Sequence, residues 1–208
     1  MKGKLIIFEG IDGSGKGTQI KLVLKKLKKL RVPAVYTVEP GGTKLGKGIR
    51  QILLHSKEHV FGETELFLFE ADRVQHFKEM VIPALKSGKI IICDRADPST
   101  IAYQYYGRGI GNLSFIEKLN DFAKDGTKAD LIILCDLGPE VGMKRVLKDT
   151  KRSSLTRFEK LKLLRKVRQG FLKQAKKNQK KWLIVDATQS PEEIHKIVWS
   201  KIIQILNF

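Results

Sequence analysis

The sequence predicts an α/β fold in which a five-stranded parallel sheet carries helices on both faces. Five short apolar runs, each of strand length, recur along the chain. Segments whose apolar residues have helical spacing separate these runs, as expected when parallel strands are joined by helical crossovers. A glycine-rich turn links the first run directly to the first helix. With 208 residues, of which 42% are hydrophobic, the chain is expected to be a single domain spanning residues 1–208.

The first strand is expected at residues 5–8, which are four consecutive apolar residues. Residues 19–30 follow as a helix, because apolar side chains recur every three or four positions and lysines occupy the opposite face. Pro33 stops this helix. Residues 34–38 form the second strand, and after a Pro-Gly-Gly turn residues 46–55 form the second helix.

A long amphipathic segment, residues 63–83, is expected to be helical, and Gly88 closes the helical region. The third strand, residues 90–93, consists of three isoleucines and a cysteine. Residues 98–111 mix aromatic and polar side chains and lead into a further helix. The fourth strand, residues 131–135, is again a short apolar run.

The last third of the chain is strongly basic. Residues 139–147 are expected to form a helix that a proline opens, and residues 148–156 a basic loop with few apolar side chains. Residues 157–181 are expected to be a basic helical region, followed by the fifth strand at residues 182–185. The final helix spans residues 191–206 and has two glutamates in its first turn, where the helix dipole favours negative charge.

A glycine-rich stretch stands between the first strand and the first helix and reads Gly10-Ile11-Asp12-Gly13-Ser14-Gly15-Lys16-Gly17-Thr18. Its glycines allow a tight turn whose backbone N–H groups point inward around a phosphate chain. The spacing matches the pattern G-x-x-x-x-G-K-[ST], which puts Lys16 within reach of β- and γ-phosphates. Gly17 departs from the pattern, because a Mg²⁺-binding hydroxyl is expected there and Thr18 comes one residue later. The sequence therefore predicts a nucleoside triphosphate site.

Charged side chains follow the strands at the carboxyl edge of the expected sheet, where folds of this class bind their ligands. These residues are Asp12, Glu39, Asp94, Arg95 and Asp136. Asp94 comes directly after a buried strand downstream of the phosphate loop, a position from which a carboxylate holds Mg²⁺ or its waters. We therefore expect one cleft, with a Mg²⁺ site in it.

The formal net charge of +18 allows two interpretations. One is nucleic-acid binding. The other is a lysine-rich surface, which we favour because the lysines have the spacing of exposed helix faces and no zinc-finger, RRM or KH pattern accompanies them. We expect no specific nucleic-acid partner and, because no apolar run approaches the eighteen or so residues that span a bilayer, no membrane association. Cys93 and Cys135 lie in apolar strands, which indicates buried reduced thiols. No signal peptide is visible in the sequence, so we expect a cytoplasmic protein.

Five motifs, taken together, carry a resemblance to a known family. They are EGIDGSGKGTQ, EPGGT followed by GKGIR, LFLFEADRVQH, CDRADPSTIAYQYYGRG and TRFEK. Their order and spacing resemble thymidylate kinase (dTMP kinase) of the bacterial type, one of the P-loop nucleoside monophosphate kinases, from Lys4 to about Lys160. The resemblance implies that the chain transfers the γ-phosphate of ATP to dTMP with Mg²⁺, giving ADP and dTDP, and that it forms a homodimer packed through helices.

The resemblance also implies roles for individual residues. Catalytic roles would belong to Lys16, Asp12, Arg95, Lys151 and Arg152. ATP would be bound by Gly10, Ile11, Asp12, Gly13, Ser14, Gly15, Lys16, Gly17, Thr18 and Arg145. The acceptor would contact Glu39, Arg50, Phe69, Arg73, Arg95, Ser99, Tyr103 and Gln104. Mg²⁺ would be bound through water by Thr18 and Asp94, since Gly17 offers no hydroxyl.

In this arrangement Phe69 would stack on thymine, while Arg73 and Gln104 hydrogen-bond the edge of the base. Tyr103 would pack against the deoxyribose, and the paired arginines would hold the acceptor phosphate. The phosphate loop itself contains no arginine, so a basic lid at about residues 148–156 would supply the cation for the transferred group. Two alternatives stay open: a kinase for another monophosphate, dUMP or AMP, and a nucleic-acid-associated ATPase without kinase activity.

Overall fold

The five expected strands pair into one parallel sheet in the computed structural model, which describes residues 3–150, 158 and 160–206. The strands lie in the order β2-β3-β1-β4-β5. Their bounds are β1 Lys4–Glu9, β2 Ala34–Val38, β3 Ile90–Asp94, β4 Leu131–Asp136 and β5 Trp182–Asp186. Because β1 lies at the centre of the sheet, the loop that follows it is flanked by the ends of β3 and β4.

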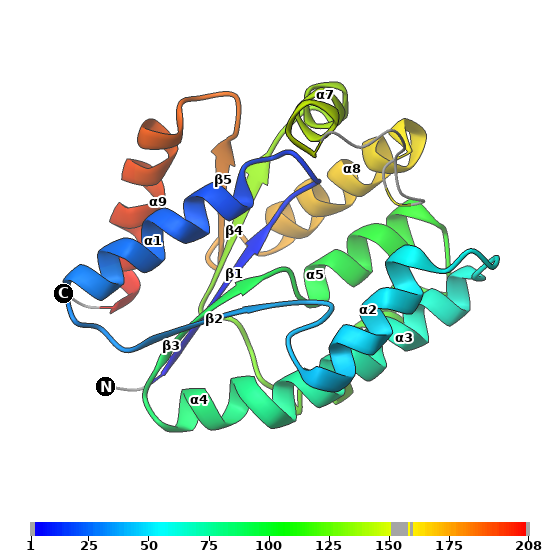
Figure 1. The fold of residues 1–208 in the computed structure, drawn as a ribbon, viewed down its shortest axis with the longest axis horizontal. Coiled ribbons are helices and arrows are strands. Elements are labelled where there is room, and N and C mark those ends of the chain that lie inside the picture. Colours follow the sequence, from blue (N-terminus) through cyan, green and yellow to red (C-terminus); the bar gives the residue numbers. More distant parts are fainter. Residues whose placement is uncertain (1–2, 151–157, 159, 207–208) are drawn as a thin grey trace.

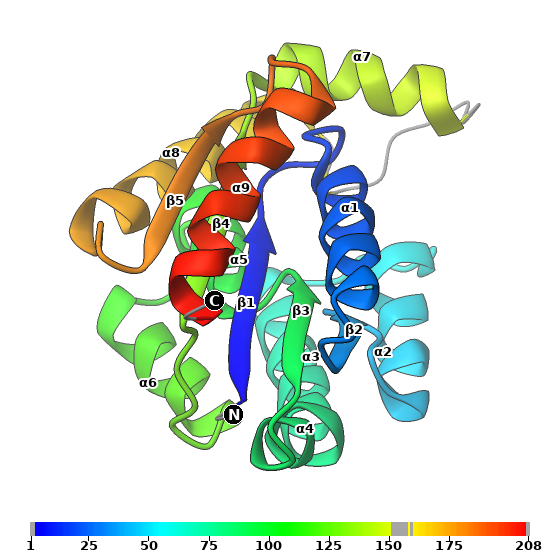
Figure 2. The ribbon, with the colours of Figure 1, turned by 90° about the vertical axis from the view of Figure 1, so that its left-hand side faces the viewer.

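Helices cover both faces of the sheet (Figure 1). Helices α1 (Lys16–Lys29) and α9 (Pro191–Leu206) lie together on one face. The opposite face is covered by α4 (Ile82–Lys86) and α8 (Leu161–Lys177). The remaining helical segments are α2 Lys44–His55, α3 Gly62–His76, the π-helical η1 Phe77–Val81, α5 Asp97–Thr100, the π-helical η2 Ile101–Gly107, α6 Leu113–Ala123 and α7 Pro139–Thr150. Figure 2 shows α3 between α2 and α6 along the lower side of the molecule.

The alternation of side chains along β1 explains how both helical layers are held. Ile6 and Phe8 face the layer of α1 and α9, whereas Leu5 and Ile7 face the layer of η1 and α4. All four side chains are at most 1% exposed, and each buried side chain of this size contributes about 1.5–3 kcal/mol relative to exposure. Glu9 follows Leu5 and Ile7 on the face toward η1 and α4, and it is also completely buried.

Several helix boundaries differ from the expected ones. Helix α1 begins at Lys16 because Gly15 takes a left-handed conformation (φ 84°) as its N-cap. The segment expected as one helix at residues 63–83 contains a π-helical turn just before Pro83, and this wider turn accommodates a residue that lacks an N–H group.

Helix α7 extends to Thr150, so residues 148–150 of the expected basic loop are helical. The rest of that loop, including Lys151 and Arg152, lies outside the described residues. Within the described part of the chain no helix is both long and apolar enough to cross a membrane. Cys93 and Cys135 are buried, free thiols, as expected.

Candidate active site

A cavity of about 260 Å³ lies where β1, β2 and β3 end. The predicted site residues that line it are Asp12, Lys16, Glu39, Arg50, Phe69, Arg73, Asp94, Arg95, Ser99, Tyr103 and Gln104. The lining residues that were not predicted as site residues are Val38, Pro40, Leu54, Ala96, Thr100 and Phe158. The phosphate-loop lysine, the candidate base-stacking ring and the candidate phosphate-binding arginine therefore share one cavity, as the sequence predicts.

The glycine-rich loop wraps tightly between β1 and α1. Gly13 has a left-handed backbone (φ 78°), and a Cβ at this position would clash with the backbone of Gly142 on α7. Ser14 is buried, and its hydroxyl has no hydrogen-bond partner within the described residues. Such an orphaned hydroxyl costs about 1–3 kcal/mol when nothing binds it.

Lys16 lies at the first turn of α1, folded back over its own loop. Its ammonium group donates hydrogen bonds to the carbonyls of Gly10 (3.1 Å) and Ile11 (3.3 Å) and lies 4.0 Å from Asp12 Oδ1. Burial, with a smaller effect from the Arg95 guanidinium, lowers the pKa of Lys16. An anion in the loop would therefore replace carbonyl partners and stabilise the ammonium form.

Arg145 reaches the outer side of the same loop from α7. Its guanidinium donates hydrogen bonds to the carbonyl of Ala187 (3.0 Å) and, at 3.4 Å, to that of Gly13. Gly17 and Thr18 are exposed in the first turn of α1 and do not line the cavity. The residues predicted to bind the triphosphate therefore form the loop itself, and Arg145 contacts the loop on the side away from the cavity.

Arg95 directly follows β3 and faces the cavity. Its Nη2 atom lies 2.6 Å from Asp12 Oδ1, and its Nη1 atom donates to the hydroxyl of Ser99 (3.2 Å). The guanidinium also lies over the ring of Tyr103, at 5.5 Å from the ring centroid. Because Asp12 belongs to the phosphate loop, this ion pair joins the donor side of the cavity to the acceptor side.

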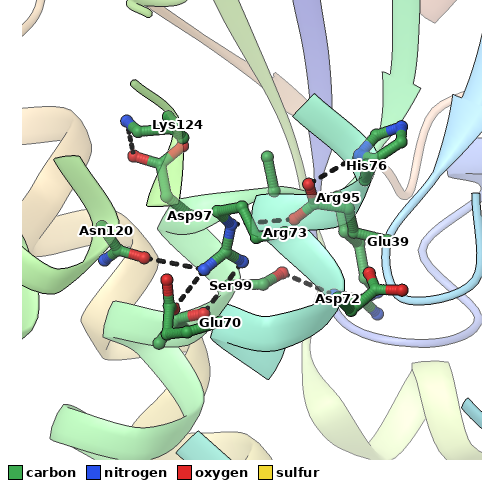
Figure 3. Close-up of polar contacts among 12 residues, drawn as sticks. Glu39, Glu70, Asp72, Arg73, His76, Arg95, Asp97, Ser99, Asn120 and Lys124 are labelled. Atoms are coloured by element: carbon green, nitrogen blue, oxygen red, sulfur yellow. Dashed lines mark hydrogen bonds and ion pairs between the residues drawn. The ribbon is translucent and has the colours of Figure 1, made fainter. Parts of the chain in front are cut away.

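Arg73 is almost completely buried and its guanidinium is surrounded by acceptors from three other elements (Figure 3). Its Nε atom donates to Glu39 (2.9 Å) and its Nη2 atom to Thr100 (3.0 Å). Its Nη1 atom donates to Asn120 (2.8 Å) and also contacts Glu70. The arginine is therefore rigid, and only a small part of its donor capacity is left for a ligand in the cavity.

Glu39 occupies the turn after β2 and is held from two sides. One oxygen accepts the Arg73 bond, and the other lies 2.8 Å from His76 Nδ1. Asp72 accepts a hydrogen bond from the backbone N–H of Gly41 in the same turn (3.0 Å), and burial together with the nearby Glu39 raises its pKa to about 6. These contacts explain why α3 and the turn after β2 keep a fixed geometry beside the cavity.

The outer part of the cavity is aromatic. Phe69 on α3 and Tyr103 on η2 both meet the ring of Phe158 edge to face, with centroid distances of 6.0 and 6.1 Å. Gln104 is 1% exposed, and its Nε2 atom has no hydrogen-bond partner within the described residues. A flat ring beside a buried, unpaired amide donor is an arrangement suited to binding a nucleobase.

Arg50 and Asp94 complete the polar end of the cavity. Arg50 Nη1 donates to the carbonyl of Pro40 (2.7 Å). Asp94 Oδ1 is buried and has no hydrogen-bond partner within the described residues. An unpaired carboxylate oxygen beside Lys16 fits a hydrated Mg²⁺ ion, which prefers oxygen ligands and retains several of its waters. Thr18 is too exposed for the structure to support the same role directly.

Sequence reasoning identified Glu39 but not the other acceptors around Arg73, which are Glu70, Thr100 and Asn120, nor the ring of Phe158. Glu70 could have been found, because it lies three residues before Arg73 on one helix face. Asn120 could not, because it reaches Arg73 from α6, 47 residues further along the chain. Phe158 belongs to the TRFEK motif, but nothing in the local pattern indicates that its ring closes an aromatic cavity.

Comparison with known proteins agrees with this geometry. The family model described as thymidylate kinase matches residues 8–198. The chain is 42% identical over 193 residues to the thymidylate kinase of Kosmotoga olearia, covering 93% of this chain and 92% of that protein. It is 44% identical over 194 residues to the thymidylate kinase of Carboxydothermus hydrogenoformans, covering 93% and 94%.

The structural comparison gives a similar result. A crystal structure of thymidylate kinase from Ehrlichia chaffeensis superimposes with a TM-score of 0.76 and 33% sequence identity, covering 97% of this chain and 99% of that one.

Proposed function

This chain belongs to the thymidylate kinase family, and from that premise we propose how its cavity transfers the γ-phosphate of ATP to dTMP. The observation that carries the proposal is the buried Gln104 side chain, whose Nε2 atom has no hydrogen-bond partner among the described residues and which lies in the same cavity as the aromatic ring of Phe69 and the ammonium of Lys16. One pocket can therefore hold a base and its phosphate while presenting that phosphate to the triphosphate loop.

The acceptor base lies on Phe69, a contact worth about 1–3 kcal/mol for a stacked base. Gln104 and Arg73 hydrogen-bond its edge, and each offers an N–H group to a carbonyl oxygen of thymine. Tyr103 packs against the deoxyribose. Arg73 can act without rearrangement because Glu39 and its other partners already fix its guanidinium.

The acceptor phosphate is held by Arg50 and Arg95, with Ser99 beside them. Both guanidiniums line the cavity, and their forked donors match phosphate oxygens. Asp12 is the residue of the phosphate loop that faces this site, and its ion pair with Arg95 (2.6 Å) orients the arginine until the phosphate arrives. The 3′-hydroxyl of the sugar is a further partner for Asp12.

The nucleophile is an oxygen of the dTMP phosphate, which is already largely ionised at neutral pH because the second pKa of a phosphate monoester is about 6. The reaction therefore needs no general base, and the chain contributes alignment and charge neutralisation. Lys16 neutralises the transferring group from the loop side. Lys151 and Arg152 are the further cations that we assign to the lid, and both lie outside the described residues.

ATP binds with its triphosphate in the loop from Gly10 to Thr18 and with its adenine beside Arg145. Asp94, whose buried Oδ1 atom has no hydrogen-bond partner in the described part of the chain, would hold a hydrated Mg²⁺ ion, and Thr18 would contribute through water. When bound, the ion would neutralise part of the phosphate charge. We place the enzyme in the cytoplasm, since both buried cysteines are free.

The test is the release of ADP with dTMP, dUMP, AMP and CMP as acceptors. We expect the highest kcat/KM with dTMP and no comparable turnover with AMP. ATP hydrolysis that is independent of dTMP and stimulated by DNA or RNA would contradict the proposal and favour a nucleic-acid-associated ATPase. A preference for AMP or dUMP would leave the chemistry intact and overturn the assignment of the base pocket.

We further propose a homodimer formed through α3 and α6. Phe67 on α3 is 58% exposed, and Phe115 and Phe122 on α6 are 46% and 77% exposed. The two helices pack side by side, so these aromatic side chains offer a surface that a second copy would cover. Light scattering should give the mass of a dimer for the unmodified chain. Phe122→Glu should lower the measured mass toward that of a monomer. A monomer mass for the unmodified chain would contradict this assembly.

A further inference from the structure

Glu9 is a buried carboxylate that the proposed mechanism does not use. It is the last residue of β1 and directly precedes the phosphate loop. The backbone N–H of Ala96 donates to Glu9 Oε1 (3.0 Å), and the hydroxyl of Ser99 donates to Glu9 Oε2 (2.6 Å). Both partners belong to the segment after β3, so one side chain ties the strand before the donor loop to the segment that carries Arg95.

The alternation along β1 explains why Glu9 reaches this segment. Glu9 follows Leu5 and Ile7 on the face away from α1, whereas the phosphate loop turns toward α1. The backbone N–H of Arg95 donates to the carbonyl of Phe8 (2.9 Å). The side-chain contacts of Glu9 extend this pairing beyond the end of the ladder between β1 and β3.

The segment that Glu9 holds has a strained backbone. Arg95 has a φ of 70°, a left-handed conformation that costs a bulky residue about 1–2 kcal/mol. Ala96 is the N-cap of the helical segment that begins at Asp97, and it has no side-chain group that could cap it. The Glu9 carboxylate reaches this turn from another strand and accepts the backbone N–H of Ala96 itself, which is the reciprocal bond of a capping box and helps to fix the turn at Arg95.

We propose that Glu9 is a positioning residue for acceptor binding, which acts by fixing the turn at Arg95 through Ala96 and Ser99. The inference rests on the proposed function, in which Arg95 holds the phosphate of dTMP. Ser99 also accepts a bond from Arg95 Nη1 (3.2 Å), so the chain of contacts runs from Glu9 through Ser99 to the guanidinium. Shape and reach dominate this role, because the direct ion pair between Glu9 Oε2 and Arg95 Nη1 is long (3.9 Å).

The protonation state of Glu9 does not interrupt these contacts. Burial raises the pKa of Glu9 to about 7, against the opposing effects of Arg95, Ser99, Ala96 and Lys16. In the neutral acid one oxygen still accepts from Ala96, and the O–H group donates to Ser99. A glutamine reproduces this neutral form, with its carbonyl toward Ala96 and its amide N–H group toward Ser99.

The test compares Glu9→Gln, which keeps the shape, with Glu9→Asp, which keeps the charge but is one methylene shorter. We expect Glu9→Asp to lower kcat/KM for dTMP by about tenfold to a hundredfold, since small misplacements of binding groups have effects of this size. The KM for ATP should change less than about twofold, because the donor loop is untouched. Glu9→Gln should retain kcat/KM for dTMP within about threefold.

Asp130→Ala is the matched control. Its carboxylate accepts the backbone N–H of Leu5 (2.9 Å) and pairs with Lys4 (3.0 Å) at the opposite end of β1. This variant should lower stability without a selective effect on the KM for dTMP. The control therefore distinguishes a general loss of stability in the central strand from a specific misplacement of Arg95.

A double variant tests whether Glu9 acts through Arg95. Glu9→Asp should have little further effect on kcat/KM for dTMP in an Arg95→Ala background, because the group it positions is already absent. Additive losses would overturn the proposal, as would a Glu9→Gln enzyme more impaired than Glu9→Asp. Absence of dTMP phosphorylation by the unmodified chain would instead refute the proposed function itself.

Discussion

Replacement of Glu9 by glutamine should make the protein more stable at neutral and alkaline pH. Glu9 is completely buried, and its pKa is raised from 4.5 to about 7, chiefly because burial disfavours the charged form. Between these two values the folded protein binds more protons than the unfolded chain. Stability conferred by this group therefore falls as pH rises through that window, and the penalty is complete above about pH 7.

The size of the effect follows from the two pKa values. A span of about 2.5 pH units, at about 1.4 kcal/mol for each unit, gives about 3 kcal/mol of unfolding free energy lost above pH 7. Glu9→Gln removes the titration while it keeps an acceptor for Ala96 and a donor for Ser99. Below pH 4.5 the unfolding free energies of the variant and the unmodified protein should differ by a constant amount. Between pH 4.5 and about pH 7 the difference should grow steadily in favour of the variant.

Urea unfolding at intervals from pH 4 to pH 9 measures this difference directly, because other titrating groups affect both proteins equally. Glu193→Gln provides a control of opposite sign, since hydrogen bonds from Ser190 lower the pKa of that exposed carboxyl. Relative to the unmodified protein, Glu193→Gln should lose stability as pH rises toward 4.5, the ordinary pKa of the carboxyl, and the difference should be constant at higher pH. A difference between Glu9→Gln and the unmodified protein that is constant from pH 4 to pH 9 would refute the reasoning.

Substitutions in the phosphate loop, the base pocket and the lid test the proposed site. Lys16→Ala should fold normally by circular dichroism but lose about 3 kcal/mol of transition-state stabilisation, a drop of roughly 150-fold in kcat; near-normal turnover would contradict the role of the loop. Phe69→Ala should raise the KM for dTMP by roughly fivefold to 150-fold, from about 1–3 kcal/mol of stacking, and leave the KM for ATP unchanged. Lys151→Ala and Arg152→Ala, singly and combined, should lower kcat in steady-state assays, and unchanged turnover would remove both residues from the mechanism.

Much of the fold could be predicted because its signals are local. Each strand is a short apolar run, and the helices have apolar residues at spacings of three and four. The π-helical turn before Pro83 was missed because it depends on how one helix continues past a proline while packed on the sheet. The extension of α7 to Thr150 was missed because residues 148–150 offer few apolar side chains to mark a helical face.

In the site, too, contiguous motifs could be predicted from the sequence, whereas contacts between distant segments could not. The phosphate loop is contiguous in the sequence, so its spacing alone points to a triphosphate. The partners of Arg73 come from separate elements, and only the folded chain brings Glu39 and Asn120 to one guanidinium. Glu9 was overlooked for a related reason: the pattern marks it as the end of a strand, whereas its contacts depend on the segment after β3.

A crystal structure with dTMP and a non-hydrolysable ATP analogue tests the central claim most directly. The account predicts thymine on Phe69, the dTMP phosphate on Arg95, and the γ-phosphate of the analogue beside Lys16, with the two phosphates facing each other in line. Binding of dTMP outside this cavity, or with its phosphate turned away from Lys16, would contradict the account.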